Sequence, residues 1–464
     1  MSYREPTRVV VLGAGIAGAT FAKKLIYQTT QRQCDITVID LRFVHVMKCA
    51  AARAVALGER FAYRVAIPNQ ELVPPSRGQV IHKKVDKILT DRNTVVLEDG
   101  GVIPYDILIC ATGAVNKSVC EPTLKLRTTR DVVKWYKHWH EQIQKNKNIA
   151  ILGAGVVGTE LAAEIKYHNP DKIVSLISND QVLIDGGSPA VLPGFNKKLK
   201  LKLDKLGVRI YLGQKPTNLT EKDFKGRCYL DTATTIKTSK GNRIEADLVL
   251  LCNGKTLNNK MYPPEWLNGL GQLVVCDTLQ LNVNPNVFAI GDVNSANVNK
   301  QAYTAIKQAD LAAKNVKSLI QSKQMKSYSP PSFTYLSLPT GRDTGVTQYG
   351  PVVLGDRITR IWKGEELEVS RRWKLYNQGN NLIRENEENW VLISDRMYPA
   401  SAGASMKYSA SPSNPYEKSS SPYGSDTGSK YKKGGRYPNG KNGSDMNHYM
   451  DYDARYGPPA LYYR

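Results

Sequence analysis

Two glycine-rich turns of identical spacing constrain this chain more than any other feature. The first turn, Gly13 to Gly18, follows the apolar run 9–12, and the second, Gly153 to Gly158, follows the apolar run 149–152. Glycines spaced Gly-x-Gly-x-x-Gly allow a tight turn, the close approach of a pyrophosphate and the packing of a helix on a strand. A helix-like segment follows each turn, so its N-terminus is placed to hold the phosphates. The sequence therefore predicts two dinucleotide sites, one for a flavin and one for the nicotinamide that reduces it.

Acidic residues stand at the places where such sites need them. Asp40 ends the predicted second strand, 36–39, where a carboxylate can bind the ribose hydroxyls of the adenosine. Asp292 follows Gly291 at the end of the apolar run 286–290. An aspartate between such a strand and a helix is typical of a contact with the ribityl chain of a flavin, so this motif predicts the flavin site.

The second site leaves the nicotinamide donor open. Ser178 occupies the position at which a carboxylate favours NADH and repels the 2′-phosphate of NADPH. Serine removes that repulsion, but no arginine follows closely to clamp a phosphate. Asp180 restores a preference for NADH if the register shifts by two residues. Both NADH and NADPH therefore stay open as donors.

The plan of the first unit repeats in the second, since the strands 106–113 and 247–254 close each of them. Residues 286–325 return to the first unit. We therefore expect an α/β fold of two Rossmann-like domains, the second inserted in the first, with a small C-terminal α+β cap and a disordered tail. The expected parts are a discontinuous FAD-binding domain (1–120 and 275–327), an NAD(P)H-binding domain (121–274), the cap (328–398) and the tail (399–464).

Local patterns predict further elements. The tail is rich in Tyr, Ser, Gly and Lys and lacks the apolar residues that offset the entropy of ordering. Thr128 begins a helix, with Asp131 as its capping-box partner. The remaining expectations are a hairpin with arms 79–85 and 94–97, helices from Thr159 and from about Gln301, and a β-rich stretch over 206–245.

The bulk composition narrows the choice of partners and compartment. A net charge of +22 attracts nucleic acid, anionic membranes and polyanionic cofactors, although a solvated basic surface is the simpler alternative. The seven cysteines show neither C-x-x-C nor C-x4-C spacing, which fits a reducing compartment without disulfides. His138 and His140 point to different helix faces, and no metal site is expected.

Targeting signals are not expected either. The few residues before the first predicted strand leave no room for a signal or transit peptide, and no apolar run approaches the roughly 18 residues of a membrane span. Residue 2 is Ser, so an N-myristoyl anchor is not expected. The expected location is the cytoplasm, with peripheral contact to a membrane or a lipid-droplet surface as the alternative.

Two single residues have competing interpretations. Cys49 lies near the position at which single-cysteine flavin peroxidases and coenzyme A disulfide reductases carry a redox cysteine, but 47–52 lacks their small polar turn. A helix-packing thiol is therefore favoured. Glu160 follows Gly158 by two residues, either as an acid in the first helical turn or as a group at the nicotinamide–flavin contact. The aromatic residues Trp135, Tyr136 and Trp139 are expected to pack in a core or between domains.

Several motifs outside the glycine turns belong to one known pattern. These motifs are Ala50–Ala54, Gly158–Lys166, Asn286–Asp292, Gly341–Gln348 and Val369–Lys374. With them, residues 8–378 resemble the apoptosis-inducing-factor-like flavoproteins, specifically the ferroptosis-suppressor-type NAD(P)H:quinone oxidoreductases, with type II NADH dehydrogenases as more distant relatives. The resemblance implies bound FAD, NADH or NADPH as donor and a hydrophobic quinone as acceptor, reduced in a ping-pong cycle. It also implies that Glu160 and Lys363 lie near the flavin and the acceptor, although Lys363 on its own reads as an exposed turn residue.

The motifs and the resemblance together predict a set of cofactor contacts. They are Gly13, Ala14, Gly15, Ile16, Ala17, Gly18, Asp40, Arg53, Val85, Thr112, Gly113, Gly153, Gly155, Gly158, Glu160, Asn253, Gly254, Gly291, Asp292, Gln301 and Ala302. Two rival functions stay open: a Cys49-dependent peroxide or disulfide reductase, and a basic redox-sensing flavoprotein that binds nucleic acid. The second rival lacks a recognised nucleic-acid motif, and a homodimer is a further possible assembly.

Overall fold

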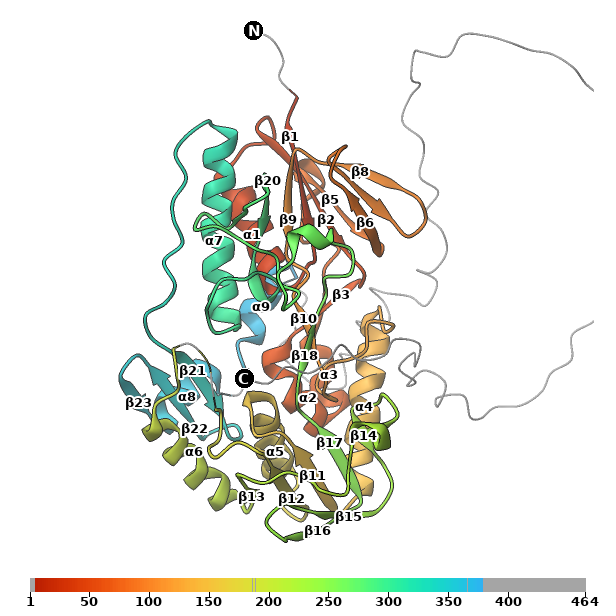
Figure 1. The fold of residues 1–464 in the computed structure, drawn as a ribbon, viewed down its shortest axis with the longest axis vertical. Helices are drawn as coiled ribbons and strands as arrows, with labels where there is room; N and C mark the ends of the chain where they lie inside the picture. Colours follow the sequence, from red (N-terminus) through yellow and green to blue (C-terminus); the bar gives the residue numbers. More distant parts are fainter. Residues whose placement is uncertain (1–4, 186, 188, 365, 379–464) are drawn as a thin grey trace, which may run out of the picture. The chain divides into compact units, whose positions relative to one another are not determined.

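The computed structural model of the chain describes residues 5–378 apart from 186, 188 and 365 (Figure 1). The predicted tail, 399–464, lies outside the described residues, and so does the last part of the predicted cap, 379–398. Within the described residues, no helix combines the length and the apolar character that crossing a membrane requires.

The first sheet has six strands in the order β19-β20-β9-β1-β2-β5. Its strands β20, β9, β1, β2 and β5 run parallel, and β19 pairs antiparallel with β20. Apolar β-branched runs form these strands because both faces of the sheet are covered. Helices α1 (Ile16–Gln28) and α7 (Ala302–Ile320) pack side by side on it (Figure 1). The strand bounds are β1 (Thr7–Leu12), β2 (Cys34–Asp40), β5 (Gly78–His82), β9 (Ile107–Cys110), β19 (Gln280–Leu281) and β20 (Asn284–Ala289).

The second sheet repeats this plan with five strands in the order β13-β12-β11-β17-β14. Strand β11 lies between β12 and β17, as β1 lies between β2 and β9. All of its residues come between β9 and β19 in the chain, which confirms a second Rossmann-like unit inserted in the first. The elements of this second unit are β11 (Asn148–Leu152), α5 (Val156–His168), β12 (Ile173–Ile177), α6 (Pro193–Leu206), β13 (Arg209–Tyr211), β14 (Tyr229–Leu230), β15 (Thr234–Lys237), β16 (Arg243–Ala246) and β17 (Leu248–Leu251).

Two segments join the units. The chain leaves the first sheet through β10 (Ala114–Asn116) and returns through β18 (Lys255–Leu257), and these strands pair antiparallel. Helix α4 (Thr129–Lys145) has the expected capping box of Thr128 and Asp131, and it packs on α2 (Ala51–Leu57) and α3 (Glu59–Val65). Its aromatic residues Trp135, Tyr136 and Trp139 are buried, which confirms the packing role expected for them.

The described part of the cap is α+β. Its antiparallel sheet has the order β21-β22-β23, and α8 packs on β21 and β22. The hydroxyls of Thr347 and Thr359 lie 2.8 Å apart and tie sheet to helix. The cap elements are β21 (Tyr335–Pro339), β22 (Gly345–Tyr349), β23 (Val352–Leu354), α8 (Asp356–Lys363) and α9 (Val369–Leu375). The domain boundaries expected from the sequence stay predictions.

The expected hairpin was wrong in its first arm. Residues 78–82 form β5, which pairs parallel with β2, and the hairpin arm is β6, which starts at Val85. The alternating pattern of 79–85 does not specify a partner, and the adjacent Lys83 and Lys84 separate two strands of different sheets. The remaining strands and short 3-10 turns are β3 (Val44–Val46), β4 (Ala66–Pro68), β6 (Val85–Leu89), β7 (Thr94–Leu97), β8 (Val102–Pro104), η1 (Lys48–Ala50), η2 (Pro75–Arg77), η3 (Glu221–Phe224), η4 (Pro264–Trp266) and η5 (Gly291–Val293).

Candidate functional site

The first glycine turn is packed so tightly that only one of its glycines faces open space. Gly13 has φ 101°, and a Cβ there would lie 2.6 Å from the carbonyl oxygen of Ala111. A Cβ on Gly18 would overlap the carbonyl oxygen of Gly13, whereas a Cβ on Gly15 would meet no atom within 4 Å. Gly15 is also the N-cap of α1, and within the described structure no side chain caps that helix. Open space in front of uncapped helix N–H groups fits a pyrophosphate, with Ala14, Ile16 and Ala17 alongside it.

The second glycine turn has the same geometry. Gly153 has φ 115°, and its Cβ would lie 2.6 Å from the carbonyl oxygen of Cys252. Gly158 would overlap Gly153, and Gly155 again faces open space as the N-cap of α5. The residues present therefore fit a second dinucleotide in the same way.

Asp40 lies at the carboxyl end of β2, beside the first turn. Its carboxylate accepts hydrogen bonds from the backbone N–H of Ala14 at 2.6 Å and of Arg42 at 2.8 Å. Burial raises the pKa of Asp40, while these two N–H groups act to lower it. The carboxylate thus holds the glycine turn in shape, and its contact with a ribose stays a prediction.

The parallel strands bring the other flavin motifs to the same edge. Thr112 and Gly113 follow β9, and Gly291 and Asp292 follow β20. A Cβ on Gly113 would meet nothing within 4 Å, so that turn is also open to a ligand. The Gly291 N–H donates to Gln308 Oε1 at 2.8 Å, which fixes the turn that carries Asp292.

Two further expected contacts begin helix α7. Gln301 is its N-cap and Ala302 its first residue, as the sequence predicted. Lys300, just before them, donates to the Asn294 and Ala296 carbonyl oxygens, and burial lowers its pKa to about 8 while Asp292 acts to raise it. The sequence reasoning did not single out this lysine.

At the second site, Ser178 follows β12 and turns Asp180 toward itself. The Ser178 hydroxyl donates to Asp180 Oδ2 at 2.8 Å, and the Asp180 N–H donates to the same hydroxyl oxygen at 3.3 Å. A carboxylate therefore stands beside the strand end although the residue at that end is serine. Asn253 and Gly254 follow β17, and both are exposed.

Val85 is placed differently from the other expected contacts. It begins β6 and packs in an apolar cluster with Leu12, Ile39 and Ile81 from the first sheet. Its side chain is 9% exposed, so any contact with a cofactor would use the backbone or the edge of that cluster.

Glu160 is a buried carboxyl on α5. Its expected place in the first helical turn was wrong, because the turn after Gly155 lets the helix start at Val156 rather than at Thr159. Only 7% of Glu160 is exposed. Burial raises its pKa to about 7, against the lowering effect of Lys363 and Arg53. A group with this pKa can hold or release a proton near neutral pH.

Lys363 lies close enough to Glu160 to influence its charge. It is the last residue of α8 and is half-buried, so it is not the exposed turn residue that its local sequence indicates. Burial raises the pKa of the Cys49 thiol, and this effect exceeds the lowering effect of Lys363. The structure thus brings together Glu160 from α5, Lys363 from α8 and Cys49 from η1.

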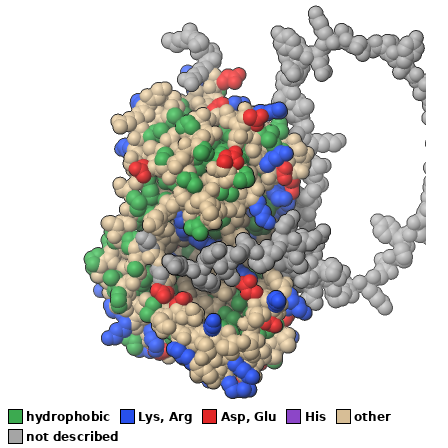
Figure 2. All heavy atoms as spheres, in the orientation of Figure 1, with side chains coloured by type: hydrophobic (Ala, Val, Ile, Leu, Met, Phe, Trp, Pro, Cys, Tyr) green, Lys and Arg blue, Asp and Glu red, His purple; other side chains and the backbone are tan. Residues whose placement is uncertain are grey.

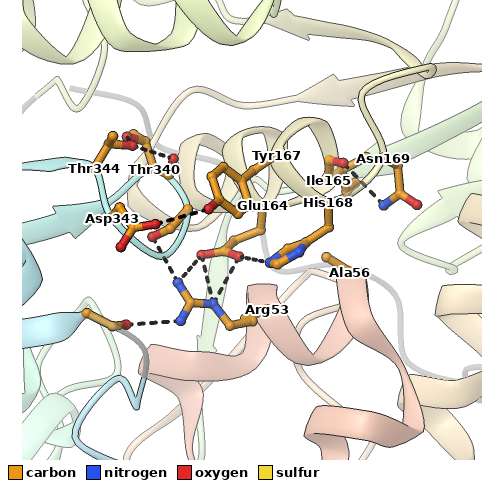
Figure 3. Close-up of polar contacts among 12 residues, drawn as sticks. Arg53, Ala56, Glu164, Ile165, Tyr167, His168, Asn169, Thr340, Asp343 and Thr344 are labelled. Atoms are coloured by element: carbon orange, nitrogen blue, oxygen red, sulfur yellow. Dashed lines mark hydrogen bonds and ion pairs between the residues drawn. The ribbon is translucent and has the colours of Figure 1, made fainter.

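Arg53 and Glu164 form a buried ion pair next to this group (Figure 3). Arg53 Nη2 lies 2.8 Å from Glu164 Oε1, and each side chain is 2% exposed. Arg53 Nη1 donates to the carbonyl oxygen of Gly364, and Nη2 also donates to that of Gly341. The guanidinium expected at a cofactor is therefore hydrogen-bonded to three other parts of the protein, and a contact with the flavin stays untested.

Glu164 was missed from the sequence, whereas Arg53 was expected as a cofactor contact and not as an ion-pair partner. Glu164 lies in an otherwise apolar run of α5, and Arg53 lies among alanines of α2. A lone charge in such a helix indicates a buried partner, so this signal was present. Tyr376 was also missed: its hydroxyl donates to the carbonyl oxygen of Ala14, and its ring stacks on His45 with centroids 4.8 Å apart.

The chain is similar to known proteins along most of its length. Residues 7–309 match the model of the family described as Pyridine nucleotide-disulphide oxidoreductase. Ferroptosis suppressor protein 1 of Xenopus tropicalis is 30% identical over 382 residues, which cover 82% of this chain and 98% of that protein. Apoptosis-inducing factor homolog B of Dictyostelium discoideum is 28% identical over 397 residues, which cover 82% of this chain and 99% of that protein.

A solved structure shares the fold. The sulfide:quinone oxidoreductase of Aquifex aeolicus matches with a TM-score of 0.63 over 83% of this chain and 94% of that chain. The sequence identity is 16%, so this likeness concerns the arrangement of the elements alone.

Proposed function

Since the chain belongs to the pyridine nucleotide-disulphide oxidoreductase family, in its apoptosis-inducing-factor-like and ferroptosis-suppressor-like branch, we propose that its electron acceptor is a hydrophobic quinone. As a member of this family, it is an FAD flavoprotein that takes electrons from NADH or NADPH. The proposal concerns the second half of the reaction, in which the reduced flavin is oxidised again. The cap is the part of the chain that bears on the choice of acceptor, because its residue Lys363 lies near Glu160.

The observation that carries the proposal is the aromatic cluster immediately before Lys363. The Trp362 ring lies 5.6 Å from Tyr335 and 6.2 Å from Tyr349, measured between centroids. A small pocket adjoins this cluster, and its lining includes Gln301, Tyr303, Phe333 and Tyr335. Gln301 is one of the expected flavin contacts. Aromatic walls near a flavin edge suit a flat apolar ring, with Lys363 as a cation for its carbonyl oxygens.

The chain's own residues have separable roles in this reaction. Gly15 and Gly155 leave room for the two pyrophosphates, and Asp40 holds the first turn in place. FAD, when bound, takes up a hydride from NAD(P)H and passes on two electrons. Reduction of a quinone to a quinol also consumes two protons. We assign Glu160 to hold one of them on its carboxyl oxygen, because its pKa of about 7 matches neutral conditions.

The rival that depends on Cys49 has less support. A thiol must ionise to attack a peroxide or disulfide, and burial raises the pKa of Cys49. All seven cysteines of the chain are free thiols in the structure. We expect Cys49→Ser to retain most quinone turnover, whereas loss of turnover would favour the thiol mechanism.

Contact with an anionic membrane would give the enzyme access to a lipid quinone. The exposed surface of the cap carries Tyr349, Val352, Ile361 and Trp362, and Ile361 is 66% exposed. Arg357 and Arg360 lie on the same helix, α8, and are exposed. Apolar and basic side chains on one surface favour binding to anionic lipids. Flotation with anionic liposomes at low salt, abolished by Ile361→Ser with Trp362→Ser, would support this contact; protein that stays in solution would exclude it.

The basic charge does not by itself favour nucleic acid. On the face drawn in Figure 2, Lys and Arg side chains lie at many places and Asp and Glu side chains lie among them. Salt-dependent DNA binding with negligible quinone turnover would support the nucleic-acid rival. The homodimer also stays a prediction.

One experiment tests the main proposal. The purified protein is reduced anaerobically with NADH or NADPH, and a short-chain ubiquinone analogue is then added while the visible flavin spectrum is followed. We expect bleaching by the nicotinamide and recovery with the quinone. Bleaching without recovery would contradict a quinone acceptor while leaving the nicotinamide half-reaction intact.

A further inference from the structure

We propose that Arg53 and Glu164 are a positioning pair, which sets the separation of Glu160 and Lys363 by joining helix α5 to the backbone that follows α8. The inference rests on the roles proposed for Glu160 and Lys363, and it adds a residue pair that contacts neither the donor nor the acceptor. The inference rests on a geometric observation: the Arg53 guanidinium binds the helix that carries Glu160 and the residue that follows Lys363.

All three guanidinium nitrogens of Arg53 take part. Nε donates to the Glu164 oxygens at 3.0 and 3.2 Å, and Nη2 donates to Glu164 Oε1 at 2.8 Å. Nη2 also donates to the carbonyl oxygen of Gly341 at 3.0 Å, and Nη1 donates to that of Gly364 at 3.0 Å. A planar guanidinium with its directions occupied in this way fixes its partners in angle as well as distance.

The partners come from three separate parts of the fold. Arg53 projects from α2 and Glu164 from α5 (Figure 3). Gly341 lies in the turn between β21 and β22. Gly364 directly follows Lys363 at the end of α8. Glu164 lies four residues after Glu160, which is about one turn of the same helix. Glu164 therefore lies one helical turn from Glu160, and Arg53 binds the residue next to Lys363.

The pair is not explained by stability alone. Two buried charges lose their hydration, and an apolar pair of similar volume is often as stable or more stable. Retaining the ion pair is then useful where it specifies one arrangement of the parts it joins. The second oxygen of Glu164 is also bound, since His168 Nε2 lies 3.2 Å from Oε2.

The two charges of the ion pair also have opposite effects on the pKa of Glu160. Glu160 faces Lys363 from α8, Arg53 from α2, Cys49 from η1 and Glu164 from its own helix. Arg53 acts to lower the pKa of Glu160, whereas Glu164 acts to raise it. Burial alone would raise the pKa of Glu164, but the hydrogen bonds from His168 and Arg53 outweigh it, so Glu164 stays ionised.

The main test separates positioning from stability. The double variant Arg53→Met with Glu164→Met removes both charges and leaves neither of them unpaired. We expect full-length holoenzyme that retains its flavin and melts somewhat below the wild type, because the carbonyl oxygens of Gly341 and Gly364 lose a donor. The maximal rate at which a short-chain ubiquinone analogue reoxidises the reduced flavin should nevertheless fall about tenfold or more, because small misplacements are costly in rate. Reduction of the flavin by NADH, in which neither Glu160 nor Lys363 has a proposed role, should keep its wild-type rate.

Reoxidation of the wild-type flavin by the quinone tests the proposed acceptor, and the rate of the variant relative to the wild type tests the positioning pair, so the two failures are distinct. A double variant that is flavin-loaded and reoxidised by the quinone at the wild-type rate would overturn the inference. Arg53→Lys keeps the charge but not the forked geometry, and it serves if the double variant does not fold. A slowed maximal rate in Arg53→Lys supports positioning, and a wild-type rate overturns it. The exposed pair Lys200 and Asp204, changed to Gln and Asn, is the matched control and should leave the rate unchanged.

Discussion

The Tyr376 hydroxyl donates a 2.8 Å hydrogen bond to the carbonyl oxygen of Ala14, although 362 positions separate the two residues. The last described helix of the cap thus leads directly onto the first glycine turn. Since Tyr376 is fully buried, this bond links the end of the described chain to the site expected to hold the flavin pyrophosphate.

Removing this hydroxyl should loosen the flavin. We expect Tyr376→Phe to lower the free energy of unfolding by about 1 kcal/mol and to speed the loss of FAD, because a buried carbonyl loses its donor. Thermal melting of the holoenzyme and the rate of FAD release in dilute solution measure both effects. Tyr27→Phe, at a residue 75% exposed on α1, is the control. Equal FAD release in the two variants would contradict the prediction.

Alanine at the open glycines should separate binding from folding. We expect Gly15→Ala to fold normally but to purify with little flavin, because its Cβ would enter the space of the pyrophosphate. Gly155→Ala should keep its flavin and raise the Kd for NADH by at least about tenfold. Gly18→Ala should fail to fold, because its Cβ would overlap Gly13. Flavin content, circular dichroism and NADH titration check these outcomes; a flavin-loaded Gly15→Ala would count against the site.

The raised pKa of Glu160 should make stability depend on pH. The folded protein holds this proton up to about pH 7, whereas the ordinary pKa is 4.5, so protonation favours folding. This contribution is present below pH 4.5 and is lost as pH rises through 7, by about 3 kcal/mol. We therefore expect Glu160→Gln to melt above the wild type at pH 8 and together with it at pH 5. The exposed Glu71→Gln should show no such difference.

The position of Asp180 predicts a preference for NADH. Its carboxylate accepts the Ser178 hydrogen bond beside β12, where it would repel a 2′-phosphate. We expect Asp180→Asn to raise kcat/KM for NADPH relative to NADH by about tenfold, which is about 1.4 kcal/mol. Steady-state kinetics with both donors measure the ratio. An unchanged ratio would mean that Asp180 does not face the adenosine ribose.

The sequence was sufficient where local pattern and long-range structure agree. The two glycine turns, the strand that ends at Asp40 and the helix capped by Thr128 were each predicted from residues adjacent in the chain. The hairpin error at 79–85 arose because an alternating strand pattern is the same for a parallel neighbour and for a hairpin. Only the position of β2 decides that β5 pairs with it.

The polar contacts between distant elements could not be derived in the same way. Arg53 and Glu164 are 111 positions apart, and each charge indicates burial with a partner without identifying it. The start of α5 at Val156 depends on how Gly155 leaves the strand, which the helix pattern after Thr159 does not show. Similarly, Lys363 reads as a turn residue until the packing of α8 on the cap sheet half-buries it.

The two glycine turns share their tightest contacts, since Gly13 and Gly153 each place a Cβ position 2.6 Å from the carbonyl oxygen that follows a neighbouring strand. The tight packing of the glycines therefore does not distinguish a nucleotide that stays bound from one that exchanges. The rest of the chain adds different contacts to each turn: Asp40 and Tyr376 hydrogen-bond to Ala14 at the first, and the backbone N–H of Ile184 lies 2.9 Å from the Ala154 carbonyl oxygen at the second. Retention and turnover of the two nucleotides are thus properties of these additions, and each can evolve without altering the turn itself.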